Sequence, residues 1–220
     1  MVNISSIIDH TLLSPTACFL DFKKLCEQAV ENGFYSVCVP PYMVESCKKA
    51  LLKTDIKVCT VIGFPFGYNH YLTKIVEAKE AILFGADEID AVVNISAIKS
   101  KDFKFVNKEI ECLRKTTNNK ILKIIVETAY LTKEEKIEIA KIILNNKVDF
   151  IKTSTGFAPA GANVDDIILF KSILKNNVKI KASGGISTYK QAEDMIKAGA
   201  SRIGTSKSID LIKNNEKNNN

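Results

Sequence analysis

Four charged side chains, Asp9, Asp90, Lys152 and Lys181, lie within or at the end of short apolar runs of the sequence. A buried lysine is costly unless its charge is lost or matched. A lysine that loses its proton becomes an amine nucleophile, which can form a Schiff base with a carbonyl compound. Alternation along a strand places Phe150 and Lys152 on one face, so Lys152 is a candidate nucleophile if that face is buried. If that face is exposed, Lys152 extends toward solvent instead.

The other three charged residues could hold charge or move protons near Lys152. Lys181 ends the next apolar run and Lys179 shares its face, so a surface lysine pair is the alternative to an inward Lys181. Inward lysines on neighbouring strands, about 4.8 Å apart, would lie within electrostatic reach of each other. Asp90 interrupts a strand-like run, where aspartate is disfavoured, so it serves either the chemistry or a neighbouring backbone N–H. Asp9 is either a turn residue or a buried partner for a substrate hydroxyl.

Two glycine-containing segments could bind a phosphate group. Gly184-Gly185 follows the seventh predicted strand, and Gly204-Thr205-Ser206 follows the eighth. In α/β barrels a phosphate is commonly held in these two loops by backbone N–H groups and a helix N-terminus. Glycine lets the backbone approach the anion closely. The alternative is that these glycines serve only tight turns.

Such residues need a scaffold that brings strand ends together, and the sequence predicts a (β/α)8 barrel. Eight short β-rich runs alternate with amphipathic segments, which is typical of a parallel sheet. An open flavodoxin-like sheet is the alternative, but it has about five strands. The predicted strands cover residues 7–11, 35–39, 57–62, 88–93, 121–126, 149–152, 178–182 and 202–204. The predicted helices cover residues 19–32, 71–84, 103–115, 164–174 and 188–198, with a further helix opened by the capping box Thr132-x-x-Glu135.

Length and composition favour one domain with a small-molecule ligand. Residues 1–213 are predicted to form a single barrel domain, and residues 214–220, NNEKNNN, a disordered tail. No run approaches the roughly 20 apolar residues of a membrane helix, and the N-terminus lacks signal-peptide features, so we expect a soluble, cytoplasmic protein. The net charge is +6, but Arg114 and Arg202 are the only arginines, which favours attraction of phosphorylated metabolites over nucleic-acid recognition.

The cysteines and histidines do not predict a metal site. None of the six cysteines forms a Cys-x-x-Cys pair, so buried reduced thiols are expected. His10 and His70 have no acid or cysteine nearby at ligand spacing, and His70 is predicted to lie near a helix start.

Eight short segments carry a more specific signal. They are Ile8-Asp9-His10-Thr11-Leu12, Val37-Cys38-Val39, Val61-Ile62-Gly63-Phe64-Pro65-x-Gly67, Ala86-Asp87-Glu88-Ile89-Asp90, Ile125-Val126-Glu127-Thr128, Phe150-Ile151-Lys152-Thr153-Ser154-Thr155-Gly156-Phe157, Lys181-Ala182-Ser183-Gly184-Gly185-Ile186 and Arg202-Ile203-Gly204-Thr205-Ser206. In order and spacing they resemble the deoxyribose-phosphate aldolase family over nearly all of residues 4–208.

The resemblance implies a role for each matching residue. Lys152 matches the Schiff-base lysine, and Asp90 and Lys181 match a pair that relays protons with a water. Phosphate-contacting positions are matched by Gly156, Gly184, Gly185 and Ser206, and pocket-lining positions by Asp9, Thr11 and Cys38. Where many members have a second serine after Ser206, this chain has Lys207, and it lacks the C-terminal tyrosine that some members have.

The implied reaction is the reversible cleavage of 2-deoxy-D-ribose 5-phosphate to D-glyceraldehyde 3-phosphate and acetaldehyde by a class I aldolase. The resemblance implies no cofactor and no metal. It also implies a small phosphorylated sugar as ligand, no nucleic acid or membrane partner, and a homodimer or homotetramer. Two alternatives stay open: another lysine-imine barrel, such as a transaldolase-like or keto-acid aldolase, and a phosphate-ligand or nucleic-acid binding module that would fit the charge of +6.

Overall fold

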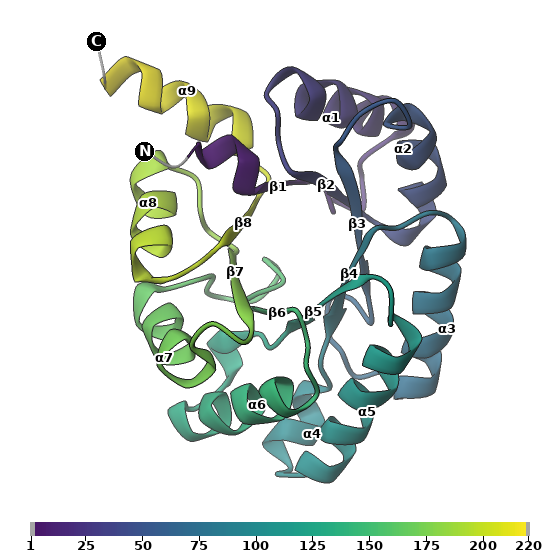
Figure 1. Cartoon of the computed structure of the whole chain (residues 1–220), viewed down its shortest axis with the longest axis vertical. Coiled ribbons are helices and arrows are strands. Elements are labelled where there is room, and N and C mark those ends of the chain that lie inside the picture. The colour runs from purple at the N-terminus through teal and green to yellow at the C-terminus, as the bar shows by residue number, and fades with distance from the viewer. Residues whose placement is uncertain (1–2, 219–220) are drawn as a thin grey trace.

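Eight parallel strands close into a barrel in the computed structural model, which describes residues 3–218 and the side chains of residues 3–213. Each strand pairs with the next along the chain, and the eighth pairs with the first. Figure 1 shows the strands at the centre and the helices in a ring around them. The predicted (β/α)8 barrel is confirmed, and every strand lies within one residue of its predicted bounds. The strands are β1 (Ile8–Thr11), β2 (Ser36–Val39), β3 (Lys57–Ile62), β4 (Glu88–Val92), β5 (Ile121–Ile125), β6 (Phe150–Lys152), β7 (Lys179–Ser183) and β8 (Arg202–Thr205).

The outer helices begin where local sequence signals place them. They are α1 (Phe19–Glu31), α2 (Val44–Ala50), α3 (Tyr71–Leu83), α4 (Ile95–Lys99), α5 (Phe103–Thr116), α6 (Lys133–Asn145), α7 (Val164–Leu174), α8 (Tyr189–Ala198) and α9 (Ser208–Asn218), with 3-10 turns at Ile4–Ile7, Pro41–Met43 and Thr128–Tyr130. The predicted capping box of Thr132 and Glu135 opens α6, and His70 caps α3 by accepting a hydrogen bond from the Leu72 N–H. The sequence predicted none of α2, α4 and α9. Helices of 7 and 5 residues, such as α2 and α4, are too short to display a periodic apolar stripe, and residues 214–218 of α9 lie in the segment expected to be disordered.

Alternation along each strand sends one set of side chains under the helices and the other into the barrel. On β6, Ile151 belongs to the main apolar core under the helices, so Phe150 and Lys152 face the interior. The same alternation on β7 turns both Lys179 and Lys181 inward. Lys179 starts the strand and is exposed at one end of the barrel, whereas Lys181 is fully buried. Of the two alternatives, the structure therefore supports the inward Lys181 and excludes a surface pair of Lys179 and Lys181.

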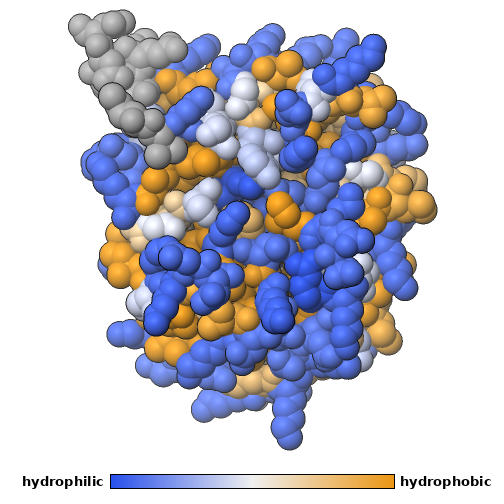
Figure 2. All heavy atoms as spheres, in the orientation of Figure 1, coloured by the Kyte–Doolittle hydropathy of each residue, from blue (hydrophilic) through white to orange (hydrophobic). Residues whose placement is uncertain are grey.

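The end of the chain is helical as far as the structure describes it. Helix α9 includes residues 214–218 of the segment predicted to be disordered, whereas residues 219–220 lie outside the described part. The tail boundary at residue 214 therefore stays a prediction. Within residues 3–218, no helix combines the length and the apolar character needed to cross a membrane. Figure 2 shows hydrophilic residues spread over one face of the molecule, with hydrophobic residues in scattered groups between them.

Candidate active site

Asp90 lies at the centre of a buried group of three lysines inside the barrel. Its Oδ2 accepts hydrogen bonds from Lys152 Nζ at 2.9 Å and from Lys181 Nζ at 2.8 Å. Its Oδ1 accepts from Lys123 Nζ at 2.7 Å. Strand register makes this arrangement, because Lys152 pairs with Lys181 across β6 and β7, and Asp90 pairs with Lys123 across β4 and β5. Burial opposes ionisation of Asp90, but the three lysines outweigh it and hold the pKa of this carboxyl well below its ordinary value.

A second layer of carboxylates surrounds the same lysines. Asp9 forms an ion pair with Lys181 and accepts hydrogen bonds from Arg202 and Ser36, each at 2.7 Å. Glu88 lies 2.5 Å from Lys123 Nζ and 3.1 Å from Arg202 Nη1. These contacts join Asp9, Glu88, Asp90, Lys123, Lys152, Lys181 and Arg202 into one buried network of four cations and three carboxylates.

Two carboxylates of the network hold Lys181 in its charged form. Burial opposes its protonation, but Asp9 and Asp90 together raise the pKa of Lys181 well above its ordinary value. A Cβ at Gly204 would come within 2.9 Å of Lys181 Cε, so only glycine leaves room on β8 for this side chain. Gly204, in the segment Arg202-Ile203-Gly204-Thr205-Ser206, therefore makes room for the buried Lys181 side chain.

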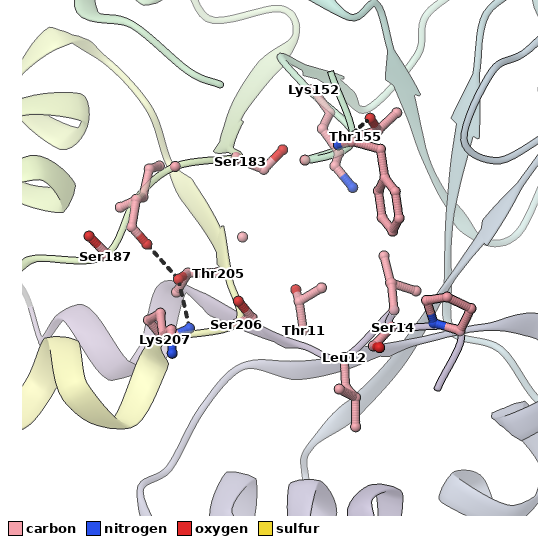
Figure 3. A pocket seen from close by; sticks show the side chains of 18 residues that line it. Thr11, Leu12, Ser14, Lys152, Thr155, Ser183, Ser187, Thr205, Ser206 and Lys207 are labelled. Carbon is pink, nitrogen blue, oxygen red and sulfur yellow. Dashed lines mark hydrogen bonds between the residues drawn. The ribbon is translucent and has the colours of Figure 1, made fainter. Parts of the chain in front are cut away.

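The network forms the floor of a cavity of about 550 Å³ at the carboxyl ends of the strands. Lys152 is the member that lines this cavity, and Figure 3 shows its ammonium group pointing into the open space. Ser206 and Lys207 lie on another side of the same space (Figure 3). The cavity brings together the predicted residues Thr11, Lys152, Gly156, Gly184, Gly185 and Ser206, whereas Asp9, Asp90, Lys181 and Cys38 lie buried beneath or beside it.

The glycine loops are shaped for close approach to a ligand. Gly184 and Gly185 have φ angles of 84° and 74°, which side-chain-bearing residues rarely adopt. A Cβ at Gly161 would lie 2.1 Å from the carbonyl oxygen of Gly184, so these two backbones pack directly against each other. The loop after β7 is thus fixed against the loop after β6. The Thr205 hydroxyl donates a hydrogen bond to the Ile186 carbonyl oxygen at 2.6 Å, which joins the loop after β7 to the end of β8, where barrels commonly hold a phosphate.

Glu127 was not identified from the sequence but holds the loop that follows Lys152. It has φ 53°, an unusual backbone conformation that non-glycine residues keep mainly at constrained sites. Its Oε2 accepts hydrogen bonds from both the N–H and the hydroxyl of Thr155. Burial raises the pKa of Glu127, although the bonds from Thr155 oppose that shift. Glu127 therefore positions Thr155, a cavity residue, against the strand end.

Lys123, Glu88 and Arg202 were also missed by sequence reasoning. Each is a charged residue in an otherwise apolar strand, at an alternate position that faces the barrel interior. The pattern that singled out Asp90 and Lys152 was present here as well. What the sequence lacks is the pairing across strands, since Lys123 and Asp90 are 33 residues apart.

Two groups of buried acids and thiols come close enough to hold a metal ion: Cys38 with Cys59 and Asp90, and Asp9 with Cys59 and Glu88. Lys123 Nζ contacts every member of the second group, at 3.3 Å from Cys59 Sγ, 2.5 Å from Glu88 and 3.9 Å from Asp9. It also contacts Cys59 and Asp90 of the first group. An ammonium group thus takes the place that a cation would need, and these residues fit a protonated lysine better than a metal.

Fold and site together define an enzyme of the (β/α)8 barrel class, with a lysine and its carboxylate partner at the carboxyl ends of the strands. A family model described as DeoC/LacD family aldolase matches residues 4–213, and the chain belongs to this family of lyases.

Known relatives match over nearly their whole length. The deoxyribose-phosphate aldolase of Ureaplasma parvum is 51% identical over 207 residues, which cover 94% of this chain and 96% of the relative. The deoxyribose-phosphate aldolase of Clostridioides difficile is 48% identical and covers 98% of both chains. Among solved structures, the tetrameric deoxyribose phosphate aldolase from Aeropyrum pernix superposes with a TM-score of 0.90 at 29% identity, covering 97% of this chain and 91% of that one.

Proposed function

We propose that this enzyme reversibly cleaves 2-deoxy-D-ribose 5-phosphate to D-glyceraldehyde 3-phosphate and acetaldehyde through an imine on Lys152. The observation that carries the proposal is the Lys152 side chain, which points into the cavity while its Nζ contacts an Asp90 oxygen that Lys181 also binds. The names of the relatives support the substrate.

Charge balance in the barrel supports Lys152 as the nucleophile. With all lysines protonated, the network has four cations and three carboxylates. A neutral amine at Lys152 leaves Lys123, Lys181 and Arg202 opposite three carboxylates. Lys152 also makes a single ion pair, with Asp90, whereas Lys181 contacts both Asp90 and Asp9. Lys152 thus has fewer carboxylate partners than Lys181 and is the lysine that lines the cavity, where its neutral amine would attack a carbonyl.

The same geometry supports the proton transfers of the reaction. The amine of Lys152 attacks the C1 aldehyde of the open-chain sugar, and loss of water gives the imine, which serves as the electron sink. Acetaldehyde takes two of the five carbons, so the C2–C3 bond breaks as the C3 hydroxyl loses its proton. Asp90 and Lys181, hydrogen-bonded at 2.8 Å, are placed to accept that proton through a water and to return one to the enamine. Hydrolysis of the resulting imine then releases acetaldehyde.

The far side of the cavity suits the phosphate group. Gly156, Gly184, Gly185 and Ser206 line it together, and α9 begins two residues after Ser206. Backbone N–H groups at glycine loops and helix N-termini favour anions. Lys207 adds a positive charge to this side of the cavity, where many relatives of this kind have a serine.

Borohydride trapping tests the assignment of the nucleophile. Reduction in the presence of acetaldehyde should add one ethyl group to the peptide that contains Lys152, and a Lys152→Arg variant should take up none at that position. The partly buried Lys48, which pairs with Asp87 on the outside of the barrel, is the internal reference for non-specific labelling. Labelling of another lysine in place of Lys152 would refute the assignment.

The choice of donor separates this proposal from other lysine-imine barrels. A panel of acetaldehyde and dihydroxyacetone donors, each with glyceraldehyde 3-phosphate as acceptor, should give product with acetaldehyde. Turnover with dihydroxyacetone alone would favour a transaldolase-like enzyme. Absence of any trapped adduct would favour a phosphate-binding module.

We further propose that the enzyme is a homodimer or homotetramer, supported by the tetrameric relative from Aeropyrum pernix. Light scattering coupled to size exclusion measures the assembly, and the mass of a single 24.4 kDa chain across the working concentration range would contradict it.

A further inference from the structure

Two cysteines of the barrel interior form a pair that the aldol reaction does not use. Cys38 on β2 and Cys59 on β3 are direct register partners, and both are fully buried. Parallel neighbouring strands lie about 4.8 Å apart, within the range of Cα separations that a disulfide spans. The two sulfur atoms lie within 4.8 Å of each other, and each thiol is close to Asp90. A bond between them therefore needs side-chain rotation but no shift of the strands.

The surroundings of the pair favour a reactive thiolate at Cys38. The nearby Cys59 thiol and the ammonium groups of Lys181 and Lys152 favour the thiolate of Cys38, whereas burial and the Asp90 carboxylate oppose it. On balance the pKa of the Cys38 thiol is lowered, which makes it the more readily oxidised thiol of the pair. A thiolate beside a second thiol is the arrangement found in oxidation-sensitive cysteine pairs.

We propose that Cys38 and Cys59 are an oxidation site, at which hydrogen peroxide closes a reversible disulfide inside the barrel. The Cys38 thiolate attacks one peroxide oxygen, the O–O bond breaks, and the departing hydroxide takes up a proton to become water. The Cys59 sulfur then attacks the sulfenic sulfur of Cys38, giving up its proton as the second water leaves. In total, two thiols and one peroxide become one disulfide and two waters.

Peroxide reaches the pair through the mouth of the barrel. Thr11, the register partner of Cys38 on β1, lines the cavity, as does Leu13. Leu13 and Phe64, both only partly buried, pack over the two thiols, so one layer of side chains separates them from the cavity. A water-sized oxidant passes such a layer when these side chains move, whereas a sugar phosphate does not. A ligand that fills the cavity should therefore slow the oxidation.

The disulfide would also disturb the acid–base group beside it. Cys59 Sγ lies 3.2 Å from Asp90 Oδ1, to which it can donate, and accepts a hydrogen bond from Lys123 Nζ at 3.3 Å. Oxidation removes that thiol proton and draws the sulfur toward Cys38, which changes the contacts of Asp90 and Lys123. A loss of aldolase activity is expected, and this part of the inference rests on the proposed function. The disulfide itself does not.

Peptide mapping after graded treatment with hydrogen peroxide tests the site without any activity assay. The fully reduced enzyme should lose 2 Da and yield a linked peptide pair that contains Cys38 and Cys59, and dithiothreitol should restore the mass. Cys26 and Cys47, a second buried pair between α1 and α2 in the apolar core, are the matched internal control. They lie away from the cavity, so they should oxidise later.

Variants separate the pair from other thiols. Cys59→Ser keeps a hydrogen-bonding group beside Asp90 but cannot form the link, so Cys38 should take up oxygen in place of losing 2 Da. Cys26→Ala should form the link as the wild type does. Failure of the link to appear at peroxide doses that already oxidise Cys18 and Cys112 would overturn the proposal, as would earlier linkage of Cys26 to Cys47.

Aldolase activity and imine trapping after oxidation test the second part of the inference, the effect of the disulfide on Asp90. If the linked enzyme forms and dithiothreitol restores an activity that had fallen at least tenfold, both the site and its effect on Asp90 are supported. If the link forms and imine trapping on Lys152 stays complete, the effect on the active site is refuted. Absence of trapping in the reduced enzyme refutes the proposed function and leaves the mass result standing.

Discussion

Replacement of Lys123 by methionine should both destabilise the barrel and impair imine formation. The Lys123 ammonium lies 2.7 Å from Asp90, 2.5 Å from Glu88 and 3.9 Å from Asp9, and all four side chains are buried. Methionine keeps the volume but leaves these carboxylates with one cation fewer. Removal of one partner from a buried ion pair costs about 3–5 kcal/mol of unfolding free energy. In a chain of this length that corresponds to a fall in Tm of roughly 6–20 °C.

The charge count adds a second expected effect. Without Lys123, the three carboxylates face Lys152, Lys181 and Arg202, so the network is balanced only when Lys152 keeps its proton. Imine formation with acetaldehyde should therefore require a higher pH in Lys123→Met than in the wild type.

Chemical unfolding and imine trapping across pH measure the two effects. Lys99→Met is the matched control, because Lys99 pairs with Glu135 at 2.9 Å on the surface, with 46% of its side chain exposed. Such a pair contributes about 0–1 kcal/mol, and its loss should leave imine formation unchanged. If Lys123→Met is as stable as the control, then Lys152, Lys181 and Arg202 are enough to stabilise the three buried carboxylates without Lys123. An unchanged pH profile would refute the charge-balance argument for Lys152.

Four further outcomes are expected. Lys181→Leu should lower turnover by at least about 10²-fold and move imine formation to higher pH, whereas an unchanged profile would make Lys181 a proton carrier only. Lys207→Ser should raise KM for deoxyribose 5-phosphate up to about fivefold, as loss of an exposed charge would, and leave KM for unphosphorylated deoxyribose unchanged; equal effects on both sugars would place Lys207 outside the phosphate site. Deletion of residues 214–220 should change neither melting nor turnover, and a large loss of either would show that the tail is structural. Because the pKa of Asp90 is lowered on folding, its stabilisation is complete above the unfolded value of about 3.9 and is lost as pH falls further; a free energy of unfolding in urea that does not fall between about pH 4 and pH 2 would contradict this.

The sequence alone determined the architecture and the proposed nucleophile that lines the cavity. Strand and helix periodicities differ, and both are local properties, so the eight strands could be placed to within one residue. A charged residue at the end of an apolar strand, as Lys152 is, or inside one, as Asp90 is, is likewise a local signal, which singled out both before any contact was known. The glycine loops at Gly184-Gly185 and Gly204 could be placed because barrel topology fixes which loops meet at the carboxyl ends of strands.

Only the tertiary structure decided which charged side chains meet. Period-2 alternation pairs Lys179 with Lys181, but closure of the barrel is what exposes the first at an open end and buries the second. The contact of Asp90 with Lys123 joins residues 33 positions apart through the register of β4 and β5. The contact of Glu88 with Arg202 joins residues 114 positions apart across the barrel interior, between strands that do not pair. Register is set by the packing of the whole barrel, and no local pattern records it. The same holds for Cys38 and Cys59, whose pairing across β2 and β3 is a consequence of strand register and not of their spacing in the chain.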